Sequence, residues 1–81
     1  MMIIEIPVTR TIDARASFSL HVRAELLAAI ADAQIGDVIA VWSRDASARI
    51  EVPAWVELSG HRVVGIESRE DYDEIFVEKR H

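Results

Sequence analysis

The stretch TIDARASFSLHV, residues 11–22, decides the fold of this chain, because an extended segment turns there into an amphipathic helix. The segment over residues 3–14 is rich in Ile, Val and Thr, and its alternating apolar positions predict a half-buried strand. Pro7 cannot donate to a strand ladder, so we expect an edge strand that is best formed over residues 9–14. Ser19 is the candidate N-cap of the helix that follows, with Ser17 as the alternative.

Residues 20–33 carry apolar side chains at helical spacing and end before Gly36, which tolerates the positive φ of a helix-ending turn. The face expected to be buried consists of Leu20, Ala24, Leu27, Ile30 and Ala31. The short apolar run over residues 38–42 predicts a central strand, parallel to the first through a right-handed helical crossover.

Asp45 is a candidate cap for a second helix over about residues 46–59, which Pro53 is expected to interrupt. Its sheet-facing side is expected to comprise Ile50, Ala54, Trp55 and Leu58. Residues 62–68 and 75–79 have the composition of two strands, joined into an antiparallel hairpin by the acidic turn 69–73. The order βαβαββ predicts a single α/β domain over residues 1–81, a two-layer α+β sandwich with a four-stranded mixed sheet and two helices on one face.

The composition disfavours several classes of function. The formal net charge of −5, with nine basic residues scattered among carboxylates, is unlike a nucleic-acid surface. No apolar run reaches the ~20 residues that span a bilayer, and residues 1–5 lack the basic start of a signal peptide. We therefore expect a cytoplasmic protein that binds neither nucleic acid nor membrane, and the absence of cysteine fits a reducing compartment.

Several short segments together resemble the TusA/SirA-like sulfur carriers, small proteins that pass a persulfide sulfur between enzymes. These segments, in order, are residues 13–15 (DAR), 36–38 (GDV), Asp45, 52–55 (VPAW) and 60–61 (GH). The resemblance covers about residues 11–79 and implies the strand order 1-2-4-3. It also implies a Cys-Pro-x-Pro motif at the start of the first helix, where the cysteine carries the sulfur.

That motif is missing from this chain. Ser19 stands at the cysteine position of the family, and Leu20 and Val22 stand at the two proline positions. A helix N-terminus readily stabilises a thiolate, whereas a serine hydroxyl forms no comparable anion near neutral pH and cannot hold a persulfide. The chain has no other cysteine, so we expect it to carry no sulfur and to have no catalytic residue and no cofactor.

Two other kinds of site, a serine nucleophile and a metal site, fit the sequence poorly. Ser19 would need a base within reach, but His21 is two residues away, where helical side chains diverge. The three histidines, His21, His61 and His81, do not have the spacing of a metal site.

One candidate surface lies at the carboxyl ends of the two parallel strands, where ligands bind in α/β sheets. It would consist of Asp13, Arg15, Ser17 and Asp45. The functional interpretation is that Arg15 holds a small anion or a partner loop beside the helix N-terminus. The structural alternative is an ion pair that ties strand ends together.

The second candidate surface is the sheet face that no helix covers. The period of the strands directs toward it Ala40, Trp42, Val63 and Phe76. An exposed cluster of this kind predicts an interface, for a homodimer or for another protein, with Trp42 as its anchor. The alternative is a shifted register that packs Trp42 in the core.

Together, these features predict a non-catalytic TusA-like protein that acts through protein–protein interaction. It would regulate or scaffold a sulfur-transfer assembly without carrying sulfur. The alternative function is a small-molecule or anion-binding domain that uses Arg15 and the N-terminus of the first helix.

Overall fold

The computed structural model describes residues 6–16 and 19–81, with Ser19 and Leu20 described in their backbone only. The elements follow the order β1 (Arg10–Asp13), α1 (Ser19–Asp32), β2 (Val38–Ser43), α2 (Ala48–Leu58), β3 (Arg62–Ser68) and β4 (Asp73–Glu78). The predicted order βαβαββ is therefore confirmed.

The four strands form one mixed sheet in the order β1-β2-β4-β3. β1 pairs with β2 in parallel, and β4 is antiparallel to both β2 and β3. The strand order 1-2-4-3 implied by the resemblance is confirmed, and β1 is an edge strand as the sequence predicted.

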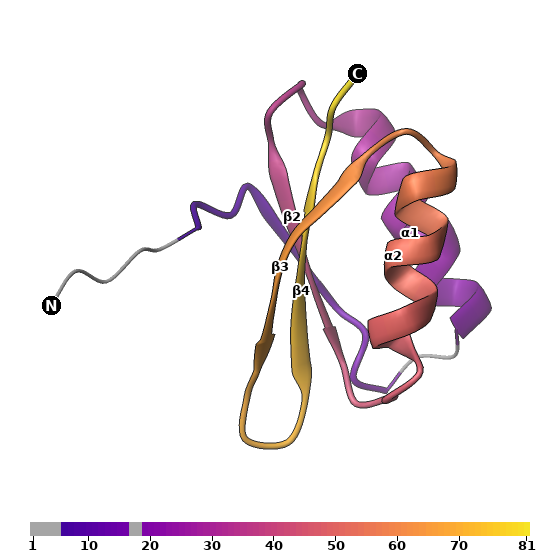
Figure 1. The fold of residues 1–81 in the computed structure, drawn as a ribbon, viewed down its shortest axis with the longest axis vertical. Helices are drawn as coiled ribbons and strands as arrows, with labels where there is room; N and C mark the ends of the chain where they lie inside the picture. Colours follow the sequence, from indigo (N-terminus) through magenta and orange to yellow (C-terminus); the bar gives the residue numbers. More distant parts are fainter. Residues whose placement is uncertain (1–5, 17–18) are drawn as a thin grey trace, which may run out of the picture.

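Both helices cover the same face of this sheet, which gives the predicted two-layer sandwich (Figure 1). The core between the layers is formed by β-branched and aliphatic side chains from the strands and the helices. Its most completely buried large members are Leu26, Ile39, Val41, Val52, Val56, Ile75 and Val77.

The buried face of α1 differs from the prediction. The helix packs Val22, Leu26, Ala29 and Ile30 against the sheet. Of the five residues expected in the core, only Ile30 is buried among those with described side chains; Ala24, Leu27 and Ala31 are exposed. The reason is that α1 has two apolar stripes on opposite sides, so the helical period alone does not say which one meets the sheet.

The buried face of α2 was also predicted wrongly. The helix buries Ala48, Val52 and Val56, whereas Ile50 and Leu58 are 76% and 84% exposed. The expected interruption at Pro53 is also absent, because α2 is a single helix that contains the proline. Pro53 is the sixth residue of α2, so the helix continues past it although the proline lacks the backbone N–H that would donate to the Arg49 carbonyl.

The start of α2 also differs from the prediction. Ser47, not Asp45, occupies the N-cap position. The Asp45 carboxylate instead accepts hydrogen bonds from the Ser47 N–H at 2.9 Å and the Ser47 hydroxyl at 2.8 Å. Asp45 thus stabilises the turn that precedes the helix.

A bulge in β3 decides which side chains reach the face opposite the helices. Val63 pairs with Val77, but the next pair along β4 is Gly65 with Phe76, so Val64 is an inserted residue. The insertion turns Val63 toward the helices and Val64 toward the other face. The expectation that Val63 belongs to the uncovered face is therefore wrong.

The face opposite the helices has a small core of its own. Val38, Ala40 and Phe76 are buried there, with Ile6 and Val64 packed against them. Ala40 and Phe76 lie on the predicted face, but they are 0% and 5% exposed. The expected exposed Trp–Phe–Val cluster is wrong, because Val63 faces the helices and Ile6 and Val64 pack against the buried Phe76, which leaves Trp42 as the half-buried member of the cluster on this face.

Both helices are followed by a glycine with positive φ, and the turn at Gly36 is the one predicted from the sequence. Gly36 after α1 and Gly60 after α2 have φ values of 93° and 79°, a backbone conformation that favours glycine. Over residues 6–16 and 19–81, no helix has the length and the apolar character needed to cross a membrane.

Candidate functional site

The carboxyl ends of β1 and β2 meet the β3–β4 turn at one end of the sheet. The backbone register sets this arrangement, because Asp13 pairs with Trp42 and Trp42 pairs with Glu74. Residues that are distant in the sequence thereby come together on the face that the helices leave uncovered. Trp42 is half-buried there in the expected register, so the alternative in which it packs in the core is wrong.

Asp13 and Arg15 form a bidentate ion pair at the end of β1. The Arg15 Nη2 and Nε atoms donate to the two carboxylate oxygens at 2.7 and 2.8 Å, and the Arg15 N–H donates at 3.2 Å. These hydrogen bonds lower the pKa of Asp13 to about 2 from an ordinary value of 3.8. An ion pair is therefore present, but it joins two residues at the end of β1, whereas the structural alternative expected it to tie two strand ends together.

The Arg15 guanidinium also lies against two aromatic rings. Its central carbon is 5.1 Å from the centroid of the Trp42 ring and 5.3 Å from that of Tyr72. The two rings are themselves 5.3 Å apart and tilted by 40°. A cation at this distance from an aromatic ring is attracted by the quadrupole of the ring. Arg15 is thus fixed by a carboxylate on one side and by aromatic rings on the other.

Glu74 fixes Trp42 from β4. The Trp42 indole N–H donates to one oxygen of Glu74 at 3.0 Å, and Arg69 donates to the other oxygen. The hydrogen bonds that Arg69 donates to the Glu74 carboxylate raise the pKa of Arg69. The carboxylate is well shielded, with 12% of the side chain exposed. We call Arg15, Trp42, Tyr72 and Glu74 the aromatic cluster.

Sequence reasoning found Arg15 and Trp42 but missed their two partners. Tyr72 lay in the acidic turn and Glu74 next to the predicted start of the last strand, so neither was connected to the candidate sites. The strand order 1-2-4-3, together with the position of the hairpin, could have connected these two residues to Trp42. That order places the β3–β4 turn beside the end of β2.

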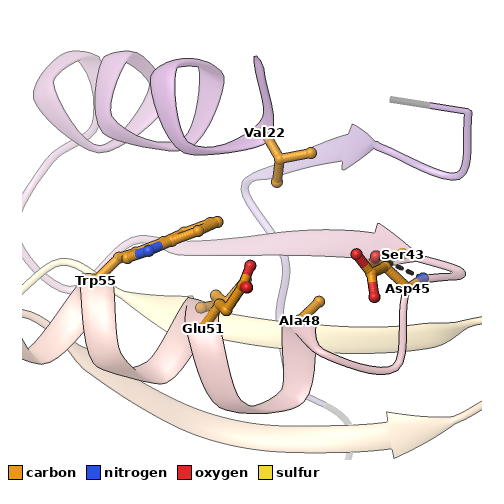
Figure 2. A pocket seen from close by; sticks show the side chains of 7 residues that line it. Val22, Ser43, Asp45, Ala48, Glu51 and Trp55 are labelled. Carbon is orange, nitrogen blue, oxygen red and sulfur yellow. Dashed lines mark hydrogen bonds between the residues drawn. The ribbon is translucent and has the colours of Figure 1, made fainter. Parts of the chain in front are cut away.

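A shallow hollow lies between the two helices, close to the start of α1 (Figure 2). Trp55 and Glu51 point from α2 toward Val22 of α1, and Asp45 closes the end near β2. Its volume is about 250 Å³, which includes space open to solvent. The enclosed part of the hollow has room for about one water molecule, whereas cavities that enclose a small ligand have volumes from about 300 to 1,000 Å³. The two carboxylates also make the hollow unsuitable for an anion.

The other predicted site residues do not form one constellation. Ser19 is the first residue of α1. Ser17, with Phe18, lies outside the described residues, and Val22 is buried at the hollow. Asp45 contacts Ser47 rather than Arg15, so the proposed group of Asp13, Arg15 and Asp45 is divided between the end of the sheet and the hollow. Within the described part of the chain, no group of three or more acidic, histidine or cysteine side chains could hold a metal ion.

Comparison with known proteins agrees with the fold. The family model described as "Sulfurtransferase TusA" matches residues 10–79. A curated protein of Archaeoglobus fulgidus, described as "Putative sulfur carrier protein", is 34% identical over 68 residues, which cover 84% of this chain and 93% of the relative. The chain therefore belongs to the TusA family of sulfur-transfer proteins.

Proposed function

We propose that this chain takes part in a sulfur-transfer assembly through protein–protein contacts and does not carry the sulfur itself. One observation carries the proposal: the chain keeps the TusA fold, but none of its 81 residues is cysteine. A persulfide needs a thiol, and the hydroxyl of Ser19, at the family's cysteine position, cannot replace it. What remains for such a chain is recognition of the proteins that handle the sulfur.

The aromatic cluster supplies a surface suited to recognition. Trp, Tyr and Arg are the residues that most often dominate the energy of protein interfaces. Here Trp42 and Tyr72 are half-buried and Arg15 is held by Asp13, so all three are already ordered before a partner binds. Little side-chain entropy is then lost on binding.

The contacts of Arg15 argue against the anion-binding alternative. Asp13 occupies two of the guanidinium donors and remains ionised down to about pH 2. An incoming anion would have to displace this carboxylate and would be repelled by it. A protein partner that packs on the exposed surfaces of the rings keeps the ion pair intact.

Mass spectrometry tests the first half of the proposal. The chain is incubated with a persulfide-bearing sulfur donor, and we expect no gain of about 32 Da, the mass of one sulfur atom. Ser19→Cys is the matched control, because it restores the thiol at the start of α1. A sulfur adduct on the wild-type chain would overturn the proposal.

A competition assay tests the second half. We expect an excess of this chain to slow sulfur transfer from that donor to a cysteine-bearing TusA-family carrier. Trp42→Ala should lose most of this inhibition, since it removes the ring on which Arg15 and Tyr72 pack. Leu58→Ala, on the other side of the molecule, is the control and should inhibit like the wild type. Equal inhibition by wild type and Trp42→Ala would exclude the aromatic cluster as the contact surface.

A further inference from the structure

Residues 79–81 follow β4 and contact the ends of both helices. Lys79 lies at the end of α1, where its Nζ atom donates to the carbonyls of Ala31 and Ala33 at 3.3 and 2.7 Å. His81 lies at the end of α2, where its Nε2 atom is 2.9 Å from the Ser59 carbonyl oxygen. Carbonyl groups at the end of a helix lack partners within the helix, so these contacts satisfy them. We call residues 79–81 the strap.

Lys79 is anchored by hydrogen bonds that involve no histidine. Its backbone N–H donates to the Asp37 carbonyl at 2.9 Å, and its carbonyl accepts from the Gly36 N–H at 2.8 Å. Its ammonium group adds the two contacts at the end of α1. Because none of these groups titrates near neutral pH, Lys79 stays in place when a histidine is protonated.

The end of the strap, Arg80 and His81, is held by His61 in the turn between α2 and β3. The Arg80 N–H donates to the Nδ1 atom of His61 at 3.0 Å. The rings of His61 and His81 are stacked, with their centroids 4.5 Å apart and their planes 12° from parallel. A backbone N–H can only donate, so the Nδ1 atom of His61 carries no proton in this arrangement. The contacts therefore require a neutral His61.

Gly60 leaves the space in which the His81 ring lies. A Cβ atom at residue 60 would be 2.5 Å from the Nε2 atom of His81, which is closer than such atoms approach one another. Any side chain there would push the ring away from the Ser59 carbonyl. The α2–β3 turn is therefore shaped to receive the end of the strap.

Protonation of His61 is incompatible with these contacts. An imidazolium donates from both nitrogens, so Nδ1 can no longer accept from the Arg80 N–H. The new charge would also lie against the His81 ring and close to the Lys79 ammonium. In agreement, burial and then the positive charges of His81 and Lys79 lower the pKa of His61 from its ordinary value of 6.5.

The charged groups around the two rings do not compensate for such a charge. The strap contributes the cations Lys79 and Arg80, and Arg80 pairs with Glu78 of β4 at 3.2 Å. β3 begins with a further cation, Arg62, directly after His61. From α2, a backbone carbonyl faces the His81 ring. Among the residues that the structure describes, no carboxylate forms an ion pair with either imidazole.

We propose that the end of the strap is a pH-sensitive switch, which is held on the α2–β3 turn while His61 is neutral and is released when His61 is protonated. The chain bends between Lys79, which stays anchored, and Arg80. Because the held state favours the neutral imidazole, its stabilisation is complete above about pH 6.5 and is lost as the pH falls below that value. Release exposes the Ser59 carbonyl and the turn at Gly60 to solvent.

The switch is separate from the aromatic cluster. Figure 1 shows the C-terminal end beside the turn that joins α2 to β3, and the β3–β4 turn at the opposite end of the sheet. Tyr72 and Glu74 of the cluster belong to that opposite end. The switch therefore does not depend on the proposed function, and a test of one leaves the other unchanged.

Backbone NMR relaxation tests the switch. In the wild-type chain at about pH 7.5, the heteronuclear NOE of the Arg80 and His81 amides should match that of β4, and at about pH 5 it should fall to values typical of a mobile segment. The midpoint of this loss should coincide with the titration of the His61 ring. Lys79 is the internal control and should stay ordered at both pH values.

His61→Asn identifies the titrating group. Its side-chain oxygen can accept from the Arg80 N–H but does not titrate, so the difference between the two pH values should disappear. His21→Asn replaces an exposed histidine of α1 and should keep the wild-type response. A wild-type chain in which Arg80 and His81 are equally ordered, or equally mobile, at both pH values overturns the proposal. A pH response that persists in His61→Asn overturns it as well.

Discussion

The two faces of the sheet are buried in different ways. The face toward the helices is covered by two complete helices, and its buried side chains, from Ile12 to Val77, form one apolar core. The other face has three buried residues beneath Ile6 and Val64, and beside them the aromatic cluster with its ion pairs. Stability thus depends mainly on one face, and the groups available for recognition are held on the other.

The largest expected effect comes from the helix-covered face. Leu26 of α1 is 1% exposed, and Leu26→Ala should lower the free energy of unfolding by about 2–5 kcal/mol, because it leaves a cavity between helix and sheet. Urea unfolding followed by circular dichroism measures the change.

The same substitution on the outside of the helix layer gives the control. Leu58 is 84% exposed, and Leu58→Ala should change the free energy of unfolding by less than about 0.5 kcal/mol. Similar losses from both variants would mean that the burial of α1 and α2 has been assigned to the wrong faces.

A smaller effect is expected at the aromatic cluster. Trp42→Phe keeps a ring in place but removes the donor to Glu74, and it should cost about 1–2 kcal/mol. Chemical unfolding of Trp42→Phe, Glu74→Gln and the double variant measures the coupling between the two side chains. Additive losses would show that the hydrogen bond contributes little to the folded state.

The smallest effect concerns the charge of Asp13. Because hydrogen bonds from Arg15 lower its pKa to about 2 from 3.8, the folded chain takes up this proton at lower pH than the unfolded chain does. The stabilisation from this carboxylate is therefore complete above about pH 4 and is lost as the pH falls through about 2. Carboxyl-carbon NMR should give a midpoint near 2, and Arg15→Ala should move it back toward 3.8. An unchanged midpoint in Arg15→Ala would contradict the role of the ion pair.

The sequence predicted the architecture well because each element had a strong local signal. The apolar run over residues 38–42 became β2, and the glycines at 36 and 60 end the two helices with positive φ. The family resemblance added the strand order, which no local pattern contains. These features suffice to bring Asp13, Arg15 and Trp42 to the same end of the sheet.

The predictions were wrong where the sequence pattern is compatible with two arrangements of the same segment. α1 and α2 each have apolar residues on both sides, so only the tertiary contacts decide that Leu26 is buried and that Leu27 is exposed. In β3, strict alternation failed because Val64 is inserted, and a bulge has no reliable signature in a single sequence. Tyr72 and Glu74 were missed because their role depends on pairing across β4 rather than on neighbours in the chain.

The bulge in β3 also affects how this protein avoids aggregation. β3 is an outer strand of the sheet, and such a strand presents unpaired backbone groups to which another chain can add. Val64 interrupts the regular ladder, and the charged residues Arg62 and Glu67 lie near the two ends of the strand. The bulge and the charges make it harder for the strand of another chain to pair with β3. The other outer strand, β1, is only four residues long, which limits such pairing there.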